Sequence, residues 1–509
     1  MAKYKTPGVY ITETSAFPAT VVPVDTAVPA FVGYTERAAY AGTSLRGVPR
    51  RITSFAEYEA CFGGSPAFGF QIEEADPAEA DFTAGAMAYR LLQTDGLFLL
   101  HRCLRHFFAN GGGACYIVSV GDYAEPIDAG RLGDGIAALE RERDVTVLVA
   151  PETTRLDAVG SSAVHRAMLA HSGGRMKNRC AILDIRDGHR PRNDPSGDAI
   201  DAFRAGVGAA YLDFGAAYYP WLNTTVVGPD EILYTAFAPV ERLQALLREE
   251  LGVPEAVDPC APAAVKQLAA AIADIASTWD AASPAERAAK QQEVNLNLLA
   301  ISPLFHQMCD AARLKANLLP PAAAMAGLYT MVDNSRGVWK APANVSLNAV
   351  VSPAVAISQA EQEDLNVDPV SGKSVNAIRT FIGQGVLVWG ARTLDGNSAD
   401  WRYINVRRTM LMVEESIRIA LKAFVFEPND ANTWATVRSM ISNFLTGIWK
   451  AGGLAGATPN DAFGVRVGLG ETMTAQDILD GLLRVTVFVA ITRPAEFIVL
   501  NLELKLTPP

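Results

Sequence analysis

Two short apolar runs, VTVLVA at residues 145–150 and CAILDI at residues 180–185, decide the fold class of this chain. Each run is nearly free of polar residues, which is typical of strands buried on both faces. A helix is expected between them over 163–171, closed by Gly173 and Gly174. A strand, a helix and a second strand at this spacing predict a parallel sheet with right-handed crossovers, and therefore an α/β fold.

The same pattern extends on both sides of these two strands. Upstream, a helix is expected over 81–110, kinked near Gly96 and ended by the glycines at 111–113, and it leads into a strand over 115–120. Downstream, a helix is expected over 199–214, before an extended piece that begins at Tyr218. The upstream segment is thus a helix-to-strand unit.

Two alanine-rich helices are expected in the middle of the chain. The first covers about 263–279, and the second begins at a capping box formed by Ser283 and Glu286. A further helix starts at Ser302 and ends before the proline pair at 320–321.

The last third carries two amphipathic helices. One covers about 406–424, with Glu414 and Arg418 four residues apart on its flank, and the other follows Pro428. The final residues, 498–506, alternate between two sets of side chains in a way that predicts a strand. The sequence contains no internal repeat.

The composition narrows the class of protein. At 509 residues the chain can form roughly three domains, each with its own core. Its 44 Lys and Arg against 55 Asp and Glu give a net charge of −11, which argues against nucleic acid as a partner. Only 19% of the residues are charged, below the usual quarter. Much of the surface is therefore expected to be covered by something other than solvated charge.

The sequence predicts neither a membrane span nor a secretion signal. The best apolar run, 482–500, is interrupted by Arg484, Arg493 and Pro494, and the N-terminal residues have no apolar stretch or cleavage pattern. The six cysteines lack paired spacing and are expected to be buried, reduced thiols. We therefore expect synthesis and assembly in the cytoplasm, with no membrane insertion.

The candidate motifs for cofactors and metals lack the spacing that such sites require. The segment GKS at 372–374 has the tail of a phosphate-binding loop, but the required first glycine is Val367. The segment GVGAAY at 206–211 ends in Tyr where a dinucleotide-binding turn needs Gly or Ala. Zinc-ligand residue types occur at His101, Cys103, His106 and Cys115. On the expected helix, however, His101 and Cys103 point apart, so no metal and no cofactor are expected.

One cluster keeps a catalytic alternative open. Asp184, Asp187 and His189 follow a predicted parallel strand, where open α/β sheets keep their sites, and Glu152 follows the preceding strand. These residues could serve an α/β hydrolase-like enzyme. The sequence has no G-x-S-x-G elbow and no HExxH motif, and Asp and His after strands are usually turn or cap residues. The enzyme is therefore the alternative hypothesis.

The two chain ends each offer a strand without an evident local partner. Near the start, residues 9–13 alternate within an arm that contains four prolines and is long enough to leave its own subunit. The other strand is 498–506. Addition of both strands to sheets of neighbouring molecules would satisfy their backbone donors and acceptors. The alternative is that both strands close sheets within their own chain.

Several sequence blocks follow one another along nearly the whole chain. The strongest are GVWKAPAN at 337–344, VWGARTL at 388–394 and WRYINVRR at 401–408. The others are PGVYITE at 7–13, VPAFVG at 28–33, FFANGGGACY at 107–116, AYYPW at 217–221, FEPND at 426–430 and RPAEF at 493–497. In this order they resemble the contractile tail sheath proteins of phages, R-type pyocins and extracellular contractile injection systems. Thr12 and the short tail from Lys505 to Pro509 depart from the family pattern.

The resemblance implies a fold of the α/β class, with a mixed α+β inner domain and inserted α/β outer domains. It divides the chain into an N-terminal arm and linker strand at 1–35, an outer inserted region at 36–125, a middle α/β domain at 126–345 and a C-terminal inner domain at 346–509. Strands at both chain ends would provide β-augmentation between subunits.

The resemblance also implies a structural role and no enzymatic one. Copies would polymerise helically, in sixfold rings, around an inner tube in a metastable extended state, and would contract to drive the tube through a target envelope. Expected partners are further copies, the inner tube protein, baseplate and terminal cap proteins and a second sheath paralogue. The final location would be a phage-tail-like particle, either free outside the cell or anchored to one.

Two sets of contact residues follow from the same resemblance. A C-terminal helix of the family faces the tube, and the matching segment here is 432–450, although a solvated helix face is the alternative. Its tube contacts are expected at Arg438, Ser442, Asn443 and Lys450. The inter-subunit strands are expected at Val9, Tyr10, Ile11, Thr12 and Glu13 and at Phe497, Val499, Asn501, Glu503 and Lys505.

Overall fold

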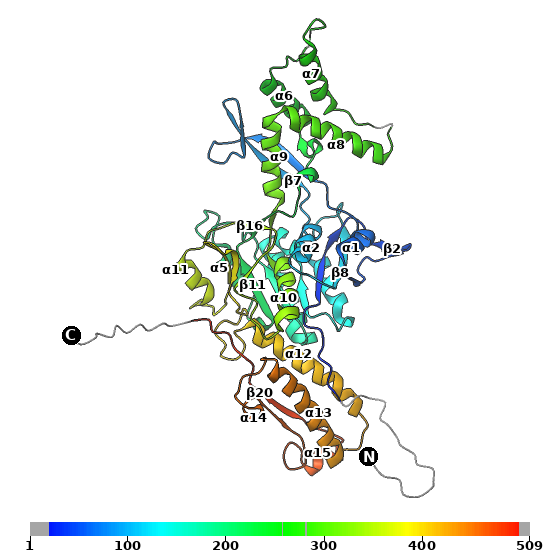
Figure 1. The fold of residues 1–509 in the computed structure, drawn as a ribbon, viewed down its shortest axis with the longest axis vertical. Coiled ribbons are helices and arrows are strands. Elements are labelled where there is room, and N and C mark those ends of the chain that lie inside the picture. The colour runs from blue at the N-terminus through cyan, green and yellow to red at the C-terminus, as the bar shows by residue number, and fades with distance from the viewer. Residues whose placement is uncertain (1–19, 257, 280–281, 498–509) are drawn as a thin grey trace, which may run out of the picture. The chain divides into compact units, whose positions relative to one another are not determined.

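The computed structural model describes residues 20–256, 258–279 and 282–497 (Figure 1). The chain divides into two compact units. Unit 2 is the continuous segment Thr26–Arg408, and unit 1 combines the residues up to Asp25 with those from Thr409 onward. The first unit is thus assembled from both ends of the chain.

Unit 2 is built on a nine-stranded sheet, in the order β15-β18-β17-β11-β10-β9-β1-β8-β4. The strands from β17 to β8 run parallel, whereas β18, β15 and β4 pair antiparallel at the two margins. This confirms the α/β prediction. The strands are β1 (Pro29–Thr35), β4 (Arg50–Ile52), β8 (Cys115–Asp122), β9 (Val147–Val149), β10 (Cys180–Asp184), β11 (Gly215–Tyr219), β15 (Val345–Ser346), β17 (Asn376–Phe381) and β18 (Gly385–Trp389).

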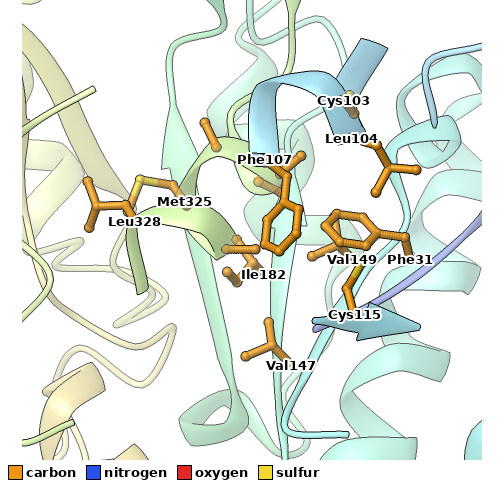
Figure 2. Packing of buried hydrophobic residues seen from close by; sticks show 14 of the residues in the cluster. Phe31, Cys103, Leu104, Phe107, Cys115, Val147, Val149, Ile182, Met325 and Leu328 are labelled. Carbon is orange, nitrogen blue, oxygen red and sulfur yellow. The ribbon is translucent and has the colours of Figure 1, made fainter. Parts of the chain in front are cut away.

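Both faces of the central strands are buried, as their apolar sequences predict. One face packs against α2 (Leu100–Ala109) and α10 (Ala322–Arg336), and the other against α3 (Ala129–Ala138) and α4 (Ala158–Leu169). Figure 2 shows the first of these cores, where the ring of Phe107 on α2 packs edge-on against Phe31 of β1 at 5.1 Å between centroids. Successive strand residues enter opposite cores, because side chains alternate across a sheet.

The helix predicted over 81–110 is wrong in its first half. Those residues form β6 (Phe82–Ala84) and β7 (Met87–Asp95), and the helix α2 begins only after Gly96, whose φ is +74°. The cause is tertiary, because β7 pairs along its length with β5 (Gly69–Glu74), and this pairing outweighs the local helix preference of the segment.

Two further helix ends differ from the prediction. The glycines 173 and 174 do not close α4, because the helix continues as a π-helix over Ala170–Met176. The helix predicted over 199–214 ends early, as α5 (Ala199–Gly206), and Gly208 adopts a φ of +79°. A side chain at position 173 would collide with Tyr211. This glycine is therefore needed for close packing and does not end the helix.

A separate core lies in a part of unit 2 that we call the insert, residues 69–95 and 228–315. It contains the sheet β13-β5-β7-β6, and Figure 1 shows its helices gathered at one end of unit 2. The predicted capping box is present, since Ser283 and Glu286 cap each other's backbone at the start of α8. The remaining insert elements are β13 (Phe237–Ala238), α6 (Val240–Leu251), α7 (Ala263–Asp274), α8 (Pro284–Ile301) and α9 (Pro303–Ala316).

Unit 1 contains the two amphipathic helices predicted for the last third. The helix α12 (Ile404–Leu421) begins with the last residues of unit 2, and α13 (Ala431–Lys450) buries one apolar face. Arg418 pairs with Glu415, one residue from the expected partner. The unit also holds the short helices α14 (Pro459–Ala462) and α15 (Ala475–Leu479) and the paired strands β19 (Phe463–Arg466) and β20 (Thr486–Val489). None of the helices in the described residues is long and apolar enough to cross a membrane.

A buried ion pair holds the two points where the chain enters and leaves unit 2. Arg408 donates to both carboxylate oxygens of Asp333 on α10, at 3.0 and 2.6 Å, and to the carbonyl of Thr26 at 2.9 Å. The Thr26 hydroxyl donates to the same carboxylate at 2.6 Å. Burial pushes the pKa of Arg408 down, but the charge of Asp333 outweighs it and the pKa rises. Arg408 therefore remains charged.

We expect Arg408→Met to destabilise the protein by about 3–5 kcal/mol, because it leaves the Asp333 carboxylate buried without its countercharge. The double variant Asp333→Leu with Arg408→Met should recover most of that loss, since no charge then stays buried. Urea unfolding measures both. The matched control is Arg90→Gln, which breaks an exposed pair with Glu73 and should cost less than about 1 kcal/mol. Equal losses for Arg408→Met and the control would contradict the prediction.

Candidate functional site

The surface of α13 presents the residues expected to face a tube. Arg438, Asn443 and Lys450 are exposed, and Ser442 is half-buried. The opposite side of the helix is buried through Val437, Met440, Ile441, Phe444, Leu445 and Ile448, which confirms the predicted apolar face. The helix starts where expected because the side chain of Asp430 accepts from the backbone N–H groups of its first turn.

Arg438 is already engaged within unit 1. Its guanidinium donates to the carbonyl of Val467 at 2.6 Å and to the carboxylate of Glu471 at 2.7 Å. Asn443 and Lys450 lie seven residues apart, so they share one face of the helix. Of the expected tube contacts, these two are therefore the most available for a partner.

The strands β19 and β20 form a sheet of only two strands within the described residues. Four residue pairs join them in antiparallel register, from Phe463 with Val489 to Arg466 with Thr486. The side chains on both strands are half-buried or exposed, and Phe488 is 51% exposed. Isolated two-stranded sheets have little stability of their own, so the outer edge of each strand is suited to accept a further strand.

The expected inter-subunit strands lie almost wholly outside the described residues. Val9, Tyr10, Ile11, Thr12 and Glu13 belong to the segment before residue 20, and Val499, Asn501, Glu503 and Lys505 to the segment after residue 497. Phe497 is described, and its side chain is 73% exposed.

The residues of the catalytic alternative have separate structural roles. Asp184 is buried at the end of β10 and accepts from the backbone N–H of Ala322, the first residue of α10, at 2.8 Å. Asp187 pairs with Arg186 at 3.0 Å. The ring of His189 packs on Trp221 at 5.0 Å between centroids. These contacts fix a helix end and a loop, and they do not assemble a nucleophile with a base.

Glu152 occupies the place where sheets of this kind usually bind ligands. From β1 the chain first adds β8 on one side and then adds β9, β10 and β11 on the other, so the order of connection switches between β1 and β9. Such switch points open a crevice at the ends of the strands. Here Glu152 Oε1 accepts from the backbone N–H groups of Leu99 and Leu100, at 3.2 and 2.9 Å, at the start of α2. A side chain at Gly33 on β1 would meet Glu152 Oε2 at 2.4 Å. The chain thus fills its own crevice with a carboxyl group.

Burial sets the protonation of these two carboxyl groups. It raises the pKa of Glu152 to about 7 and that of Asp184 to about 8, although the backbone hydrogen bonds pull both values down. A catalytic carboxyl would need access to substrate, whereas Glu152 and Asp184 are at most 2% exposed.

The motifs set aside in the sequence have structural partners as well. Lys373 donates to the carbonyl of Arg204, and Ser374 donates to the carbonyl of Asn366 at 2.6 Å, so the GKS segment is a packed turn. His106 Nε2 lies 3.2 Å from the carbonyl of Asn348. Burial lowers the pKa of His101 to about 4. Across the described ranges, no three potential metal ligands come together.

A family model described as the phage tail sheath C-terminal domain matches residues 397–505. The tail sheath protein of Vibrio phage KVP40 is 26% identical over 245 residues, which is 46% of this chain and 34% of that protein. The tail sheath protein of Enterobacteria phage T4 is 30% identical over 143 residues, or 27% of this chain and 20% of that protein. The chain therefore spans about a third or less of the curated relatives it matches.

Two solved structures cover nearly the whole chain. The anti-feeding prophage (AFP) helical sheath in its contracted state gives a TM-score of 0.60 at 28% identity, covering 98% of this chain and 99% of that one. The PVC sheath complex of an extracellular contractile injection system, also contracted, gives 0.58 at 27% identity, covering 99% and 98%. The likeness extends over both units.

We expect Asp184→Asn to become more stabilising as the pH rises. The native carboxyl keeps its proton up to about pH 8, whereas its ordinary pKa is 3.8, so the unfolded chain releases the proton first. The free energy of unfolding of the parent therefore falls between about pH 4 and pH 8. Asparagine stays neutral and still accepts from Ala322 N–H. Urea unfolding at pH 4, 6 and 8 measures the difference, with the exposed Asp230→Asn as control. A difference that does not change with pH would rule out this titration.

Proposed function

Because this chain belongs to the contractile tail sheath family, we propose that it is the structural sheath subunit of a contractile, phage-tail-like injection particle. Copies polymerise helically around an inner tube in a metastable extended state. Contraction then releases free energy through new contacts between subunits and drives the tube into a target envelope. The residues offered for a hydrolase support only structural roles, so no enzymatic step is part of the proposal.

The observation that carries the proposal is the two-stranded sheet of β19 and β20 in unit 1. It offers two strand edges, and the sequence offers two terminal strands, 9–13 and the segment from Phe497 to Lys505. A strand from one neighbour on each edge would give a sheet of four strands from three molecules. Such links are heterologous and do not close on themselves, so they build an open helical array.

Backbone pairing suits a structure that must change shape without coming apart. The strand ladder depends on main-chain donors and acceptors, so it needs no particular side chains on the neighbouring subunit. Subunits could therefore change their spacing while they remain connected. The low charged fraction of 19% agrees with a surface that is largely interface.

The proposed partners divide between the ends and the faces of the subunit. Further copies, arranged in sixfold rings, take the terminal strands, and the inner tube contacts α13 through Asn443 and Lys450, with Arg438 and Ser442 beside them. Baseplate and cap proteins, and a second sheath paralogue, would meet the ends of the polymer. The division expected from the resemblance makes 346–509 with the arm 1–35 the inner part, and 36–125 and 126–345 the outer part. It differs from the two compact units, because the nine-stranded sheet of unit 2 also contains β1, β17 and β18.

Assembly is proposed to take place in the cytoplasm, and the finished particle is either released or anchored to a cell. The similar solved structures include the baseplate of AFP and the sheath of the PVC extracellular contractile injection system, which supports the injection-system branch of the family.

We expect the double substitution Tyr10→Pro and Ile11→Pro to abolish sheath formation while the subunit stays folded. Proline removes the backbone N–H, so neither edge of this strand can complete a ladder. The matched control is Tyr10→Ala with Ile11→Ala, which keeps both N–H groups and should still assemble. Negative-stain electron microscopy with the tube protein, together with thermal unfolding, measures the outcome. Long, regular sheaths from the proline variant would refute strand exchange.

We expect Lys450→Glu to weaken co-assembly with the tube by several-fold, most strongly at low salt. The change reverses an exposed charge on the face of α13. Lys422→Glu is the control, because Lys422 is also exposed and comes directly after α12, just as Lys450 is the last residue of α13, so both substitutions carry the helix-dipole penalty. Co-sedimentation with the tube protein at two salt concentrations gives the comparison. Equal effects of the two substitutions would remove α13 from the tube interface.

A further inference from the structure

Four segments of chain connect the insert to the nine-stranded sheet. They are 63–68 before β5, 96–98 after β7, 224–227 before the insert's second part and 316–318, which runs from the last residue of α9 into the strand β14 (Leu318–Leu319). Connections of this kind act as hinges unless something fixes them, because few contacts cross between separate cores. The core of the insert is distinct from the two cores that flank the sheet.

Arg102, on α2, contacts three of these four segments. Its guanidinium donates to the carbonyls of Gly96 at 2.7 Å and Phe98 at 3.0 Å, and to that of Ala316 at 2.6 Å. It also lies over the ring of Phe68, 5.3 Å from the centroid. The side chain is among the largest that are fully buried, at 1% exposure. Burial lowers its pKa to about 10, so it remains charged at neutral pH.

A hydrophobic side chain could not replace Arg102, because it could not donate hydrogen bonds to these backbone carbonyls. A buried guanidinium costs desolvation energy, and here backbone carbonyls from separate segments compensate for it. The planar group reaches segments 96–98 and 316–318 at the same time, which a single ammonium could not do with the same geometry. The side chain therefore joins pieces of chain that are more than two hundred residues apart in sequence.

Asn317 joins the third segment to the fourth. Its side-chain oxygen accepts from the backbone N–H of Val227 at 2.8 Å, and its amide donates to the Val227 carbonyl at 3.0 Å. The hydroxyl of Thr224 donates to the Asn317 carbonyl at 2.8 Å. Asn317 is 5% exposed, so these bonds are shielded from water.

We propose that Arg102 and Asn317 form a buried polar lock that fixes the orientation of the insert on the nine-stranded sheet. Between them the two side chains contact all four connecting segments. With the lock closed, the insert and the sheet move as one body. Both act as positioning residues, since neither belongs to the core of the insert. An exposed ion pair between Arg105 and Glu231 spans the same junction and is a natural comparison.

Distances between spin labels test the lock in the full chain. Cys260, the one exposed cysteine among the described residues, is replaced by Ser, and labels are attached through Leu296→Cys on α8 and Val159→Cys on α4. Double electron–electron resonance should give one narrow distance distribution in this background. Arg102→Met and Asn317→Ala should each broaden it, and Arg102→Lys should broaden it less than Arg102→Met.

Arg105→Gln is the matched control, because it removes the exposed pair at the same junction and should leave the distribution narrow. Hydrogen exchange provides a second measurement that separates a lost lock from lost folding. Amides of 96–98 and 316–318 should exchange faster in Arg102→Met, while the buried turns of α9 keep their protection. A broad distribution in the background protein, or an unchanged one in both Arg102→Met and Asn317→Ala, would overturn the proposal. If Arg102→Met does not fold, Asn317→Ala alone decides.

Discussion

The ion pair of Arg408 with Asp333 is the contact on which the chain's organisation depends. Unit 1 draws on both ends of the chain, so the chain must leave unit 2 twice, after Arg408 and before Thr26. Arg408 binds the carbonyl of Thr26 and the carboxylate of Asp333 together, which places the two exits side by side. A buried charge pair suits this position, because a displaced exit would leave a charge without its partner.

The α/β sheet of unit 2 is a scaffold whose usual ligand site is filled from within. Glu152 binds the first N–H groups of α2, and Asp184 does the same for α10. The free N–H groups at the start of a helix attract anions. In this sheet two internal carboxyl groups already accept hydrogen bonds from such N–H groups. The fold therefore says little about function, as is general for widely used folds. In our proposal the working parts are strand edges and helix faces on the outside.

The same principle recurs at the root of the insert. Arg102 satisfies backbone carbonyls of separate segments in a place without a carboxylate in hydrogen-bonding contact among the described residues. The two terminal nitrogens of the guanidinium make all three of these bonds, and a shifted segment would lose its bond to a buried charge, so the contacts specify geometry more sharply than apolar packing does. In our proposal, the buried polar lock and the ion pair of Arg408 with Asp333 keep large pieces of one chain rigid while its terminal strands pair with neighbouring subunits.

The sequence by itself determined the features that short stretches encode: the buried strands at 147–149 and 180–184, the capping box of α8 at Ser283 and the apolar face of α13. The family resemblance, carried by blocks along the whole chain, agreed with the comparisons, while the terminal strands stay predictions outside the described residues. Only the tertiary structure decided that 87–95 is a strand, that Glu152 caps α2 and that Arg102 joins the insert. The reason is physical: each of these depends on a partner distant in sequence, and no local pattern records the energy of such a contact.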